Sequence, residues 1–406
     1  MPALLIKVGR SPIQHGSVGG VRTLGRLGVD DFAVTEDRFT PTAMSRYLRE
    51  RFSWASEPGA PADELVVGLN DTGARIGARS VLVATDDEAA VLIAEHRAEL
   101  RERFLLPSVP AELPRRLASK FGLAELCHAH GVPAPRCRSP QRPDDVAEMA
   151  TEIGFPIVLK NDRPWERLAN PAVSSTTVIR DAQELARVAE SWPSMPSVML
   201  QEYLPRDRAQ DWIVHMYCAR DGETVVAFTG LKVRSWRPYA GVTAVACSVP
   251  NTALATLAVG FARSLGFRGI ADMDWRLDER DGSYKLLDFN PRVGAQFRLF
   301  ETDTGIDVVR AMHLDLTGRP LPGGRQIDGR RYIVEDLALA SAVAYRRDHA
   351  PKEPVFGLAR AGVERAWLAS DDPLPALAAA VRIAIHVLRR LGRKRLRRAS
   401  ESDSAE

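Results

Sequence analysis

Short apolar runs alternate with amphipathic stretches along the first 110 residues. Leu4–Val8, Phe32–Val34 and Ser80–Ala84 have the length and composition of buried strands. Asp86–Arg103 has helical periodicity, with acidic residues in its first turn, where they favour the helix dipole. Strands that alternate with helices are typical of a parallel sheet covered by helices. The glycines of HGSVGGVRTLG do not form a dinucleotide-binding fingerprint, and we expect them to mark a tight turn.

After about residue 111 helices come first and strands follow. The periodicity predicts helices over Pro114–His130 and Asp144–Glu152, and FPIVLK at 155–160 is a compact buried strand. Residues 197–300 contain several strand-like runs. The pattern predicts an α/β (α+β) chain in three regions. We expect these regions at 1–112, at 113–320 (with lobes at 113–195 and 196–320) and at 321–406.

Two strand-like runs near residue 280 predict a β-hairpin. Ala271–Leu277 and Tyr284–Asn290 flank Asp281-Gly282, a dipeptide typical of tight hairpin turns. Side chains alternate across a strand, so polar residues two positions apart share a face. The second run and the residues after it place three polar groups on one side, opposite two carboxylates of the first run. These groups are Asp288, Asn290 and Arg292, and opposite them Asp272 and Asp274.

The hairpin carboxylates have the composition of a metal site. Two carboxylates and an amide oxygen are costly to gather in a sheet unless a cation lies among them. Oxygen ligands in low number suit Mg²⁺ or Mn²⁺ that bridges phosphates, rather than zinc. The alternative is a salt-bridge network in which the carboxylates pair with Arg276, Arg292 or Arg298.

A longer motif contains this hairpin. DFNPR begins 14 residues after the second aspartate of DMDW, and it resembles the signature hairpin of the ATP-grasp superfamily, an acidic residue in a VEF-like strand followed by an E-x-N-x-R strand. The resemblance covers roughly residues 115–315. TGLKVRSWRPYAGVTA resembles the K-x-R-x-x-P…G segment of the D-aspartate ligase-like and carboxylate–amine ligase branch, and HGSVGGVRTLGRLGV and MSRY (44–47) resemble the N-terminal lobe of that branch.

The resemblance implies a Rossmann-like N-terminal lobe followed by two α+β lobes that clasp ATP. It implies that Lys120 and Lys160 are the helix and strand lysines that contact the ATP phosphates, since a compact ammonium suits a phosphate. Asp211 stands where an acidic residue commonly holds the ribose hydroxyls. The hinge that meets adenine through backbone groups is implied at Glu202, Tyr203 and Leu204.

The resemblance also assigns the reacting end of the site. Lys232 and Arg234 would point toward the phosphate or the acceptor, and Arg292 would steady the phosphoryl group or the acyl intermediate. Both metal carboxylates are Asp where Glu is more common, which places the ions nearer the backbone or behind a water. The lid after the strand lysine, NDRPWERLANPAVSS, lacks the glycine cluster of many relatives. The implied Mg²⁺ (or Mn²⁺) ligands are Asp274, Asp288 and Asn290, with Asp272 as the alternative to Asp274.

The implied reaction is an ADP-forming ligation in two steps. A small carboxylate or amino acid attacks the γ-phosphate of ATP to give an acyl phosphate, and an amine then displaces phosphate. A bicarbonate-using carboxylase or carbamoyl-phosphate-type enzyme is one alternative, and a non-catalytic nucleotide-binding protein is another. The arginines suggest an anionic substrate because guanidinium groups match carboxylates, and two aromatic residues could form a wall beside it. These residues are Arg234, Arg237, Arg292 and Arg298, with Trp236 and Tyr239.

Composition and charge limit the setting. No run of about 18 apolar residues could span a membrane, and no signal peptide is evident, so we expect a cytoplasmic protein. A net charge of +3 gives no reason to expect nucleic acid, and the frequency of dimers makes a homodimer the default. Four cysteines without CxxC pairing predict free thiols rather than disulfides or zinc: Cys127, Cys137, Cys218 and Cys247.

The C-terminal region carries a basic amphipathic helix at about 373–398. Asp372-Pro373 begins it, and apolar residues follow at spacings of three and four: Leu374, Leu377, Val381, Ile385, Leu388 and Leu391. Arginines and one lysine crowd the same helix: Arg382, Arg389, Arg390, Arg393, Lys394, Arg395, Arg397 and Arg398. We expect the apolar stripe to pack on the body of the protein. The alternative is peripheral contact with an anionic membrane.

Overall fold

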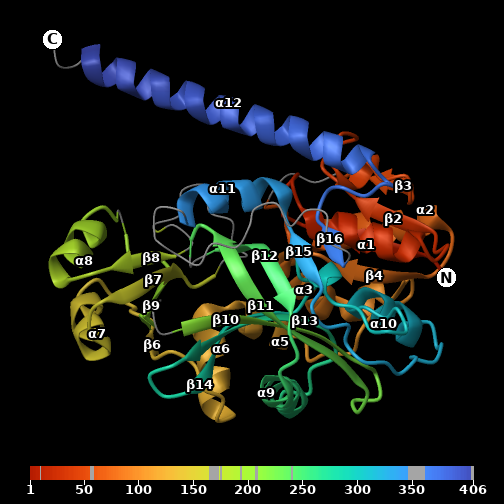
Figure 1. The fold of residues 1–406 in the computed structure, drawn as a ribbon, viewed down its shortest axis with the longest axis horizontal. Helices are drawn as coiled ribbons and strands as arrows, with labels where there is room; N and C mark the ends of the chain where they lie inside the picture. The colour runs from red at the N-terminus through yellow and green to blue at the C-terminus, as the bar shows by residue number, and fades with distance from the viewer. Residues whose placement is uncertain are drawn as a thin grey trace.

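The described residues form three sheets, which follow one another along the chain (Figure 1). The computed structural model describes residues 1–9, 11–54, 59–163, 173, 176–192, 194–205, 209–238, 241–345 and 362–403, with the side chains of the last helix described as far as 388. We call the five-stranded sheet and its helices the N-lobe (3–105), the four-stranded sheet and its helices the middle lobe (137–202), and the seven-stranded sheet and its helices the C-lobe (209–365).

The N-lobe has the predicted parallel α/β architecture. Its strand order is β3-β2-β1-β4-β5, and every neighbouring pair is parallel. The chain moves outward from β1 to β3 and then returns to β4, so the strand order reverses between β1 and β4. The strands are β1 Ala3–Ile6, β2 Asp31–Val34, β3 Leu48–Phe52, β4 Ser80–Ala84 and β5 Phe104–Leu105. The helices are α1 His15–Gly25, α2 Ala62–Ile76, α3 Asp87–Glu95 and α4 Arg97–Leu100, with a 3₁₀ turn at Thr42–Met44.

The glycine-rich segment HGSVGGVRTLG is α1 itself, so the expected tight turn is wrong. Its glycines lie where the helix meets neighbouring elements. A Cβ on Gly16 would lie 3.1 Å from the Cα of Ala295, and one on Gly20 would lie 2.5 Å from Leu5 Cδ2. Absence of a side chain therefore lets α1 pack closely on β1 and on the loop that follows β14. A glycine cluster signals close approach as readily as a turn.

The middle lobe is an antiparallel sheet covered by two helices. Its order is β6-β9-β7-β8, with β6 Cys137–Arg138, β7 Ile157–Asn161, β8 Thr177–Ile179 and β9 Val198–Glu202. The covering helices are α7 Asp145–Ile153 and α8 Ala182–Ala189. Apolar side chains of these helices and strands form a core of their own, separate from the cores of the body.

The helix predicted over Pro114–His130 is two helices, α5 Leu113–Ala118 and α6 Lys120–Ala129. Ser119 has extended backbone angles between them, and its hydroxyl accepts a hydrogen bond from Gly122 N as the N-cap of α6. The break places Lys120 at the first position of α6.

The C-lobe sheet has the order β14-β13-β10-β11-β12-β15-β16. The predicted hairpin is β13–β14, and its register sets Asp274 opposite Asp288 and Asp272 opposite Asn290. The strands are β10 Ala209–Cys218, β11 Val225–Trp236, β12 Val242–Ser248, β13 Gly269–Asp278, β14 Ser283–Asn290, β15 Arg331–Ile333 and β16 Val363–Arg365. The helices are α9 Thr252–Ser264, α10 Val308–Leu316 and α11 Glu335–Tyr345, with a 3₁₀ turn at Phe297–Leu299.

The N-lobe and the C-lobe share one hydrophobic core. Val21 of α1, Tyr217 of β10 and Phe297 belong to the same cluster, while α5, α6 and α9 cover the other face of the C-lobe sheet. Strands β15 and β16 add residues beyond 321 to this sheet, so the region expected as an extension contributes to the body. All four cysteines are free thiols.

Helix α12 (Leu374–Asp403) runs along the top of the molecule and extends beyond it (Figure 1). The expectation that its apolar stripe packs on the body is wrong for the described part, because the stripe side chains are exposed: Leu374, Leu377, Val381, Ile385 and Leu388. A different face is in contact. Ala379 is 1% exposed, and Arg382 donates to the carboxylate of Asp37. A short side chain such as that of Ala379 lets α12 approach the body more closely than a leucine would.

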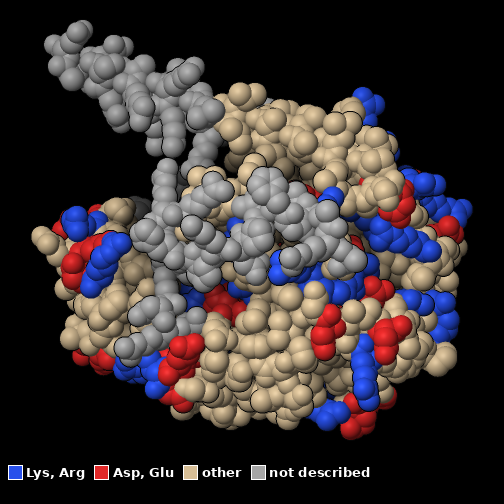
Figure 2. All heavy atoms as spheres, in the orientation of Figure 1, with Lys and Arg blue, Asp and Glu red and all other residues tan. Residues whose placement is uncertain are grey.

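The described part of α12 presents mainly uncharged atoms on the face shown in Figure 2. From the second half of the helix onward the predicted arginine side chains lie outside the described residues. Contact of this helix with an anionic membrane stays a prediction. Within the part of the chain that is described, no helix combines the length and the apolar character needed to cross a bilayer.

Asp31 carries the clearest energetic cost in the fold. It begins β2, is fully buried, and neither of its carboxylate oxygens has a hydrogen-bonding partner among the described residues. Burial, together with the neighbouring Asp30, raises the pKa of Asp31 to about 9. The folded protein therefore keeps this group protonated at pH 7, whereas the unfolded chain ionises it above its ordinary pKa of 3.8.

Replacement of Asp31 with Asn should therefore stabilise the protein at alkaline pH. Stability of the wild type falls as pH rises from about 4 to about 9, because only the unfolded state releases this proton. We expect Asp31→Asn to gain about 2 kcal/mol or more at pH 8 and little at pH 4, measured by urea denaturation across that range. Asp71→Asn, on the exposed surface of α2, is the control. A gain that does not change with pH would contradict the assignment.

Candidate active site

A cavity of about 770 Å³ opens where the three lobes meet. In the space-filling view, acidic and basic atoms lie side by side in the hollow beside the middle lobe (Figure 2). All but one of the predicted site residues line this cavity: Lys120, Lys160, Glu202, Tyr203, Leu204, Asp211, Lys232, Asp274, Asp288, Asn290 and Arg292. The exception is Arg234, which is buried in β11 and does not belong to the lining.

Asp162 fixes Lys120 relative to Lys160. Its backbone carbonyl accepts from Lys120 N at 3.0 Å, and its carboxylate accepts from Phe121 N at 2.7 Å and from the Ser119 hydroxyl at 3.0 Å. These bonds join the start of α6 to the end of β7, where Lys160 lies. Sequence reasoning missed this residue because it placed Asp162 in the lid segment. Its position two residues after Lys160 is the one feature of the sequence that could have indicated its role.

The two lysines differ in their partners. Lys120 Nζ donates to Asp288 Oδ1 at 2.6 Å, and although burial opposes the charge, this carboxylate raises the pKa of Lys120. Lys160 is 9% exposed and makes no ion pair with any described residue. Burial lowers the pKa of Lys160, and the Asp288 carboxylate offsets this only in part. Lys160 is thus a buried ammonium group that no described carboxylate contacts directly.

The metal-type carboxylates face each other on the hairpin. Lys232 Nζ lies 2.9 Å from Asp274 Oδ1, and Lys120 holds Asp288. Burial and the neighbouring carboxylates of Asp272 and Asp288 raise the pKa of Asp274, whereas Lys120 and Lys160 outweigh burial and lower that of Asp288. The two aspartates therefore form a site of concentrated negative charge that a cation would stabilise.

The donor set fits a divalent cation that prefers oxygen. Asn290 uses its amide nitrogen to donate to the Asp272 carbonyl at 3.2 Å, which leaves its oxygen available, and the Asp274 carboxylate has Lys232 as its ion-pair partner. No group of three or more His, Cys, Asp or Glu residues in the described ranges is arranged to hold a metal. A cation between Asp274 and Asp288 would therefore need Asn290 and further oxygens from a ligand such as a phosphate.

Asp272 is engaged elsewhere. Its Oδ1 lies 2.7 Å from His215 Nε2, and its Oδ2 accepts from Arg292 Nη1 at 2.7 Å. These two partners lower the pKa of Asp272 in spite of burial. A Cβ at Gly294 would collide with both His215 and Asp272, so the loop after β14 covers the pair. This geometry favours Asp274 over Asp272 as the first metal ligand, and sequence reasoning did not foresee the role of His215.

Arg292 joins the N-lobe to the C-lobe. Besides Asp272, its guanidinium lies 3.3 Å from Asp87 at the start of α3. Burial opposes the charge, but Asp87 and Asp272 outweigh it and raise the pKa of Arg292. Two carboxylates from two lobes thus fix the orientation of this guanidinium beside the hairpin.

The opposite end of the cavity contains the predicted adenine hinge. Glu202 accepts from Arg280 at 2.9 Å and from Arg136 N at 3.2 Å, so its carboxylate braces the hinge and leaves the backbone of the next residues to a ligand. Asp211, predicted to hold ribose, accepts two hydrogen bonds from Arg276 at 2.6 and 3.0 Å. A ribose would have to share Asp211 with this guanidinium.

The remaining predicted features divide between the described and undescribed parts of the chain. Most of the lid segment and Tyr239 lie outside the described residues. Trp236 is 37% exposed. Arg298 does not line the cavity; its guanidinium donates to Asp307 Oδ2 at 2.8 Å.

Relatives in sequence cover only part of this chain. No family model matches it. It is 24% identical to the D-aspartate ligase of Enterococcus faecium over 241 residues, which are 57% of each protein. It is 30% identical to the carbamoyl phosphate synthase large chain of Deinococcus radiodurans over 183 residues, 41% of this chain and 16% of that one. The chain thus spans little more than half of one curated relative and a sixth of the other.

A solved structure matches nearly the whole chain. The N5-carboxyaminoimidazole synthetase of Staphylococcus aureus, complexed with ADP, superposes with a TM-score of 0.63 at 12% identity and covers 86% of both chains. That enzyme and the D-aspartate ligase belong to the ATP-grasp superfamily. The chain therefore has the ATP-grasp fold, as its DFNPR hairpin predicted.

Proposed function

We propose that the protein is an ATP-dependent, ADP-forming carboxylate–amine ligase. The observation that carries the proposal is that one cavity contains both a positively charged site and a negatively charged site. Lys160 is a buried ammonium group without a described anionic partner, and Asp274 and Asp288 form a carboxylate pair suited to a cation. A nucleotide triphosphate with a divalent cation supplies both missing charges at once.

The nucleotide would lie between the middle lobe and the C-lobe. The backbone at Tyr203 and Leu204 would meet the base, and Lys120 and Lys160 would hold the phosphates. The ADP complex of the structurally similar synthetase supports a nucleotide in this fold. Mg²⁺ or Mn²⁺ would be held by Asp274, Asp288 and Asn290, and when bound it offsets the charge of the transferring phosphoryl group.

The reaction would proceed by transfer of the γ-phosphoryl group. An oxygen of the substrate carboxylate forms a bond to the γ-phosphorus, the bond to the bridging oxygen breaks, and ADP leaves. The amine nitrogen then bonds to the acyl carbon, the carbon–oxygen bond breaks, inorganic phosphate leaves, and the amine proton passes to phosphate or solvent. Lys232 and Arg292 would hold the charged oxygens during these steps, so catalysis would depend on positioning and electrostatics.

A second candidate function differs from this one in the acid that is phosphorylated. The partial match to a carbamoyl phosphate synthase large chain favours a bicarbonate-using enzyme as the alternative. Phosphate release that depends on bicarbonate and on no other acid would support that alternative. Tight ATP binding without release across a broad panel of acids and amines would indicate a nucleotide-binding protein without catalysis.

Loss of Asp288 should abolish turnover. We expect Asp288→Asn to reduce phosphate release from ATP by about 100-fold or more, because the cation loses a charged ligand and Lys120 loses its partner. Release is measured with Mg²⁺ against a panel of amino acids and small carboxylic acids paired with amines. Asp281→Asn, on the exposed turn of the same hairpin, should behave as wild type. Equal rates for Asp288→Asn and wild type would refute the metal assignment.

Loss of Lys160 should act on the nucleotide. Lys160→Met keeps the length of the side chain and removes the ammonium group, so we expect ATP to bind about tenfold or more weakly by calorimetric titration. Removal of an uncompensated buried charge should at the same time leave the unliganded protein equally or more stable. Arg142→Met, on the exposed surface of the same lobe, is the control. Unchanged ATP affinity in Lys160→Met would place the phosphates elsewhere.

A further inference from the structure

Helix α12 turns its larger apolar side chains away from the body of the protein. Five of them, at spacings of three and four, are between 43% and 67% exposed, and we call them the outer stripe: Leu374, Leu377, Val381, Ile385 and Leu388. The side chains of Ala379 and Ile383 pack on the body, about half a turn round the helix from this stripe. A contiguous exposed apolar surface of this kind is typical of a site that meets a partner.

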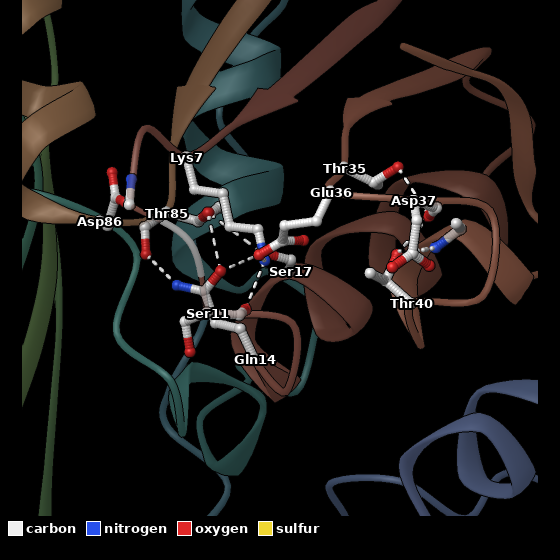
Figure 3. A network of polar contacts seen from close by, with 12 residues as sticks. Lys7, Ser11, Gln14, Ser17, Thr35, Glu36, Asp37, Thr40, Thr85 and Asp86 are labelled. Atoms are coloured by element: carbon white, nitrogen blue, oxygen red, sulfur yellow. Dashed lines mark hydrogen bonds and ion pairs between the residues drawn. The ribbon is translucent and has the colours of Figure 1, made fainter. Parts of the chain in front are cut away.

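Polar contacts on the body-facing side fix the orientation of the helix. Arg382 donates to the Asp37 carboxylate and, at 3.0 Å, to the Phe39 carbonyl. The turn that carries Asp37 is itself braced, because the hydroxyls of Thr35 and Thr40 donate to the Asp37 carbonyl at 3.3 and 3.1 Å (Figure 3). These bonds hold α12 against the N-lobe, so the outer stripe faces outward.

Three aspartates at the junction of α12 and the N-lobe are each paired with an arginine. Asp371 accepts from Arg26 at 2.8 Å, and Asp372 is buried and accepts from Arg22 at 3.0 Å. The third is Asp37, which holds the helix as described above. These three aspartates therefore present no unpaired charge that would repel an anionic surface.

The sequence that follows the outer stripe is strongly basic. Between Asp372 and Glu401 it contains eight arginines and lysines and no acidic residue, and seven of the eight lie within 389–398, which we call the basic segment. Helix α12 continues through this segment and extends beyond the body (Figure 1). An apolar stripe next to concentrated positive charge is typical of helices that lie in the interface of an anionic membrane.

A second copy of this chain is the other partner that an apolar stripe could meet. Residues 373–400 contain no aspartate or glutamate, so two α12 helices would have no acidic side chains to offset their basic ones. Parallel pairing would also place two basic segments side by side, where like charges repel. An anionic lipid surface matches both features at once, because it offers an apolar layer beneath a layer of negative charge.

We propose that α12 is an interfacial helix that holds the protein on the surface of a bilayer containing anionic lipids. The outer stripe enters the boundary between the head groups and the acyl chains, and the basic segment supplies the charge that attracts lipid phosphates. The helix lies in the plane of the membrane and does not cross it. This role uses no residue of the cavity and does not depend on the reaction proposed above.

Co-sedimentation with lipid vesicles tests the proposal. The whole 406-residue chain is mixed, without ATP, with vesicles of phosphatidylcholine alone or of phosphatidylcholine and phosphatidylglycerol in equal amounts. We expect the protein to bind the vesicles with phosphatidylglycerol about tenfold or more tightly, and high salt should weaken this binding. Equal binding to the two kinds of vesicle, or binding to neither, overturns the proposal.

A substitution in the outer stripe separates insertion from attraction by charge alone. Leu377→Asp should weaken binding to the anionic vesicles by about tenfold or more, because a carboxylate replaces a leucine that enters the bilayer. Val67→Asp, on α2, is the matched control: Val67 is 60% exposed and Leu377 is 62% exposed, and both variants change the net charge equally. Equal binding by the two variants overturns insertion of the stripe.

The basic segment is tested by two sets of substitutions at the same positions. Glutamine at Arg393, Lys394 and Arg395 should weaken binding by about tenfold or more and reduce its dependence on salt. Lysine in place of the two arginines, with arginine in place of Lys394, keeps the charge and should bind as wild type. Equal loss of binding in both sets would contradict attraction by charge.

Analytical ultracentrifugation without lipid tests the second copy as the partner. We expect wild type and Leu377→Asp to have the same mass at the concentrations used with vesicles. A dimer that Leu377→Asp dissociates, together with no binding to anionic vesicles, would assign the outer stripe to a second copy and overturn the proposal. Phosphate release from ATP without vesicles should be the same in wild type and Leu377→Asp, so failure of the membrane proposal leaves the ligase proposal to its own tests.

Discussion

The structure depends on how it compensates charges that are buried together. Asp274 and Asp288 face each other across a hairpin, and lysines from three separate elements surround them: Lys120 of α6, Lys160 of β7 and Lys232 of β11. Each set of charges stabilises the other, because both are partly removed from water. The resulting ion pairs join α6 and β11 to the hairpin.

Two of the three lysines form an ion pair with a hairpin carboxylate, and the third does not. Lys120 and Lys232 each lie within 3 Å of a hairpin carboxylate, whereas Lys160 has no described partner. A cation at the carboxylates would take over the role of the paired lysines, and a phosphate chain would take over the role of the carboxylates. Binding of both together exchanges one balanced arrangement for another. Such an exchange would leave the charges of the site balanced both with and without the ligands.

Local pattern predicted the hairpin well and tertiary contacts poorly. Alternation and the Asp281-Gly282 turn sufficed to place Asp288 opposite Asp274, because strand geometry fixes which side chains share a face. The break at Ser119 was not predicted, since a single extended residue inside a helical pattern changes little in its periodicity. The exposed stripe of α12 was misjudged for a related reason: periodicity shows that a helix has an apolar face, and it does not show which face meets the body.

The contacts that orient the site come from residues that no motif marks. Asp162 holds the start of α6, and His215 lies against Asp272. Each depends on a pair of segments far apart in sequence. The role of a buried polar residue depends on its neighbours in space, which the sequence around it does not reveal. These roles can therefore be assigned only from the folded structure. The resemblance of DFNPR predicted the chemistry of the hairpin, and it did not predict the residues that hold the hairpin and α6 in place, such as His215 and Asp162.

The position of Arg292 divides the cavity into two parts with different supports. On one side lie Lys160 and the hinge at Tyr203 and Leu204, next to the middle lobe, which has a core of its own. On the other side the N-lobe and the C-lobe share one core and are joined at Arg292 through Asp87 and Asp272. A change on the N-lobe side of Arg292 can therefore leave the middle lobe undisturbed, because the two parts of the cavity are supported by separate hydrophobic clusters.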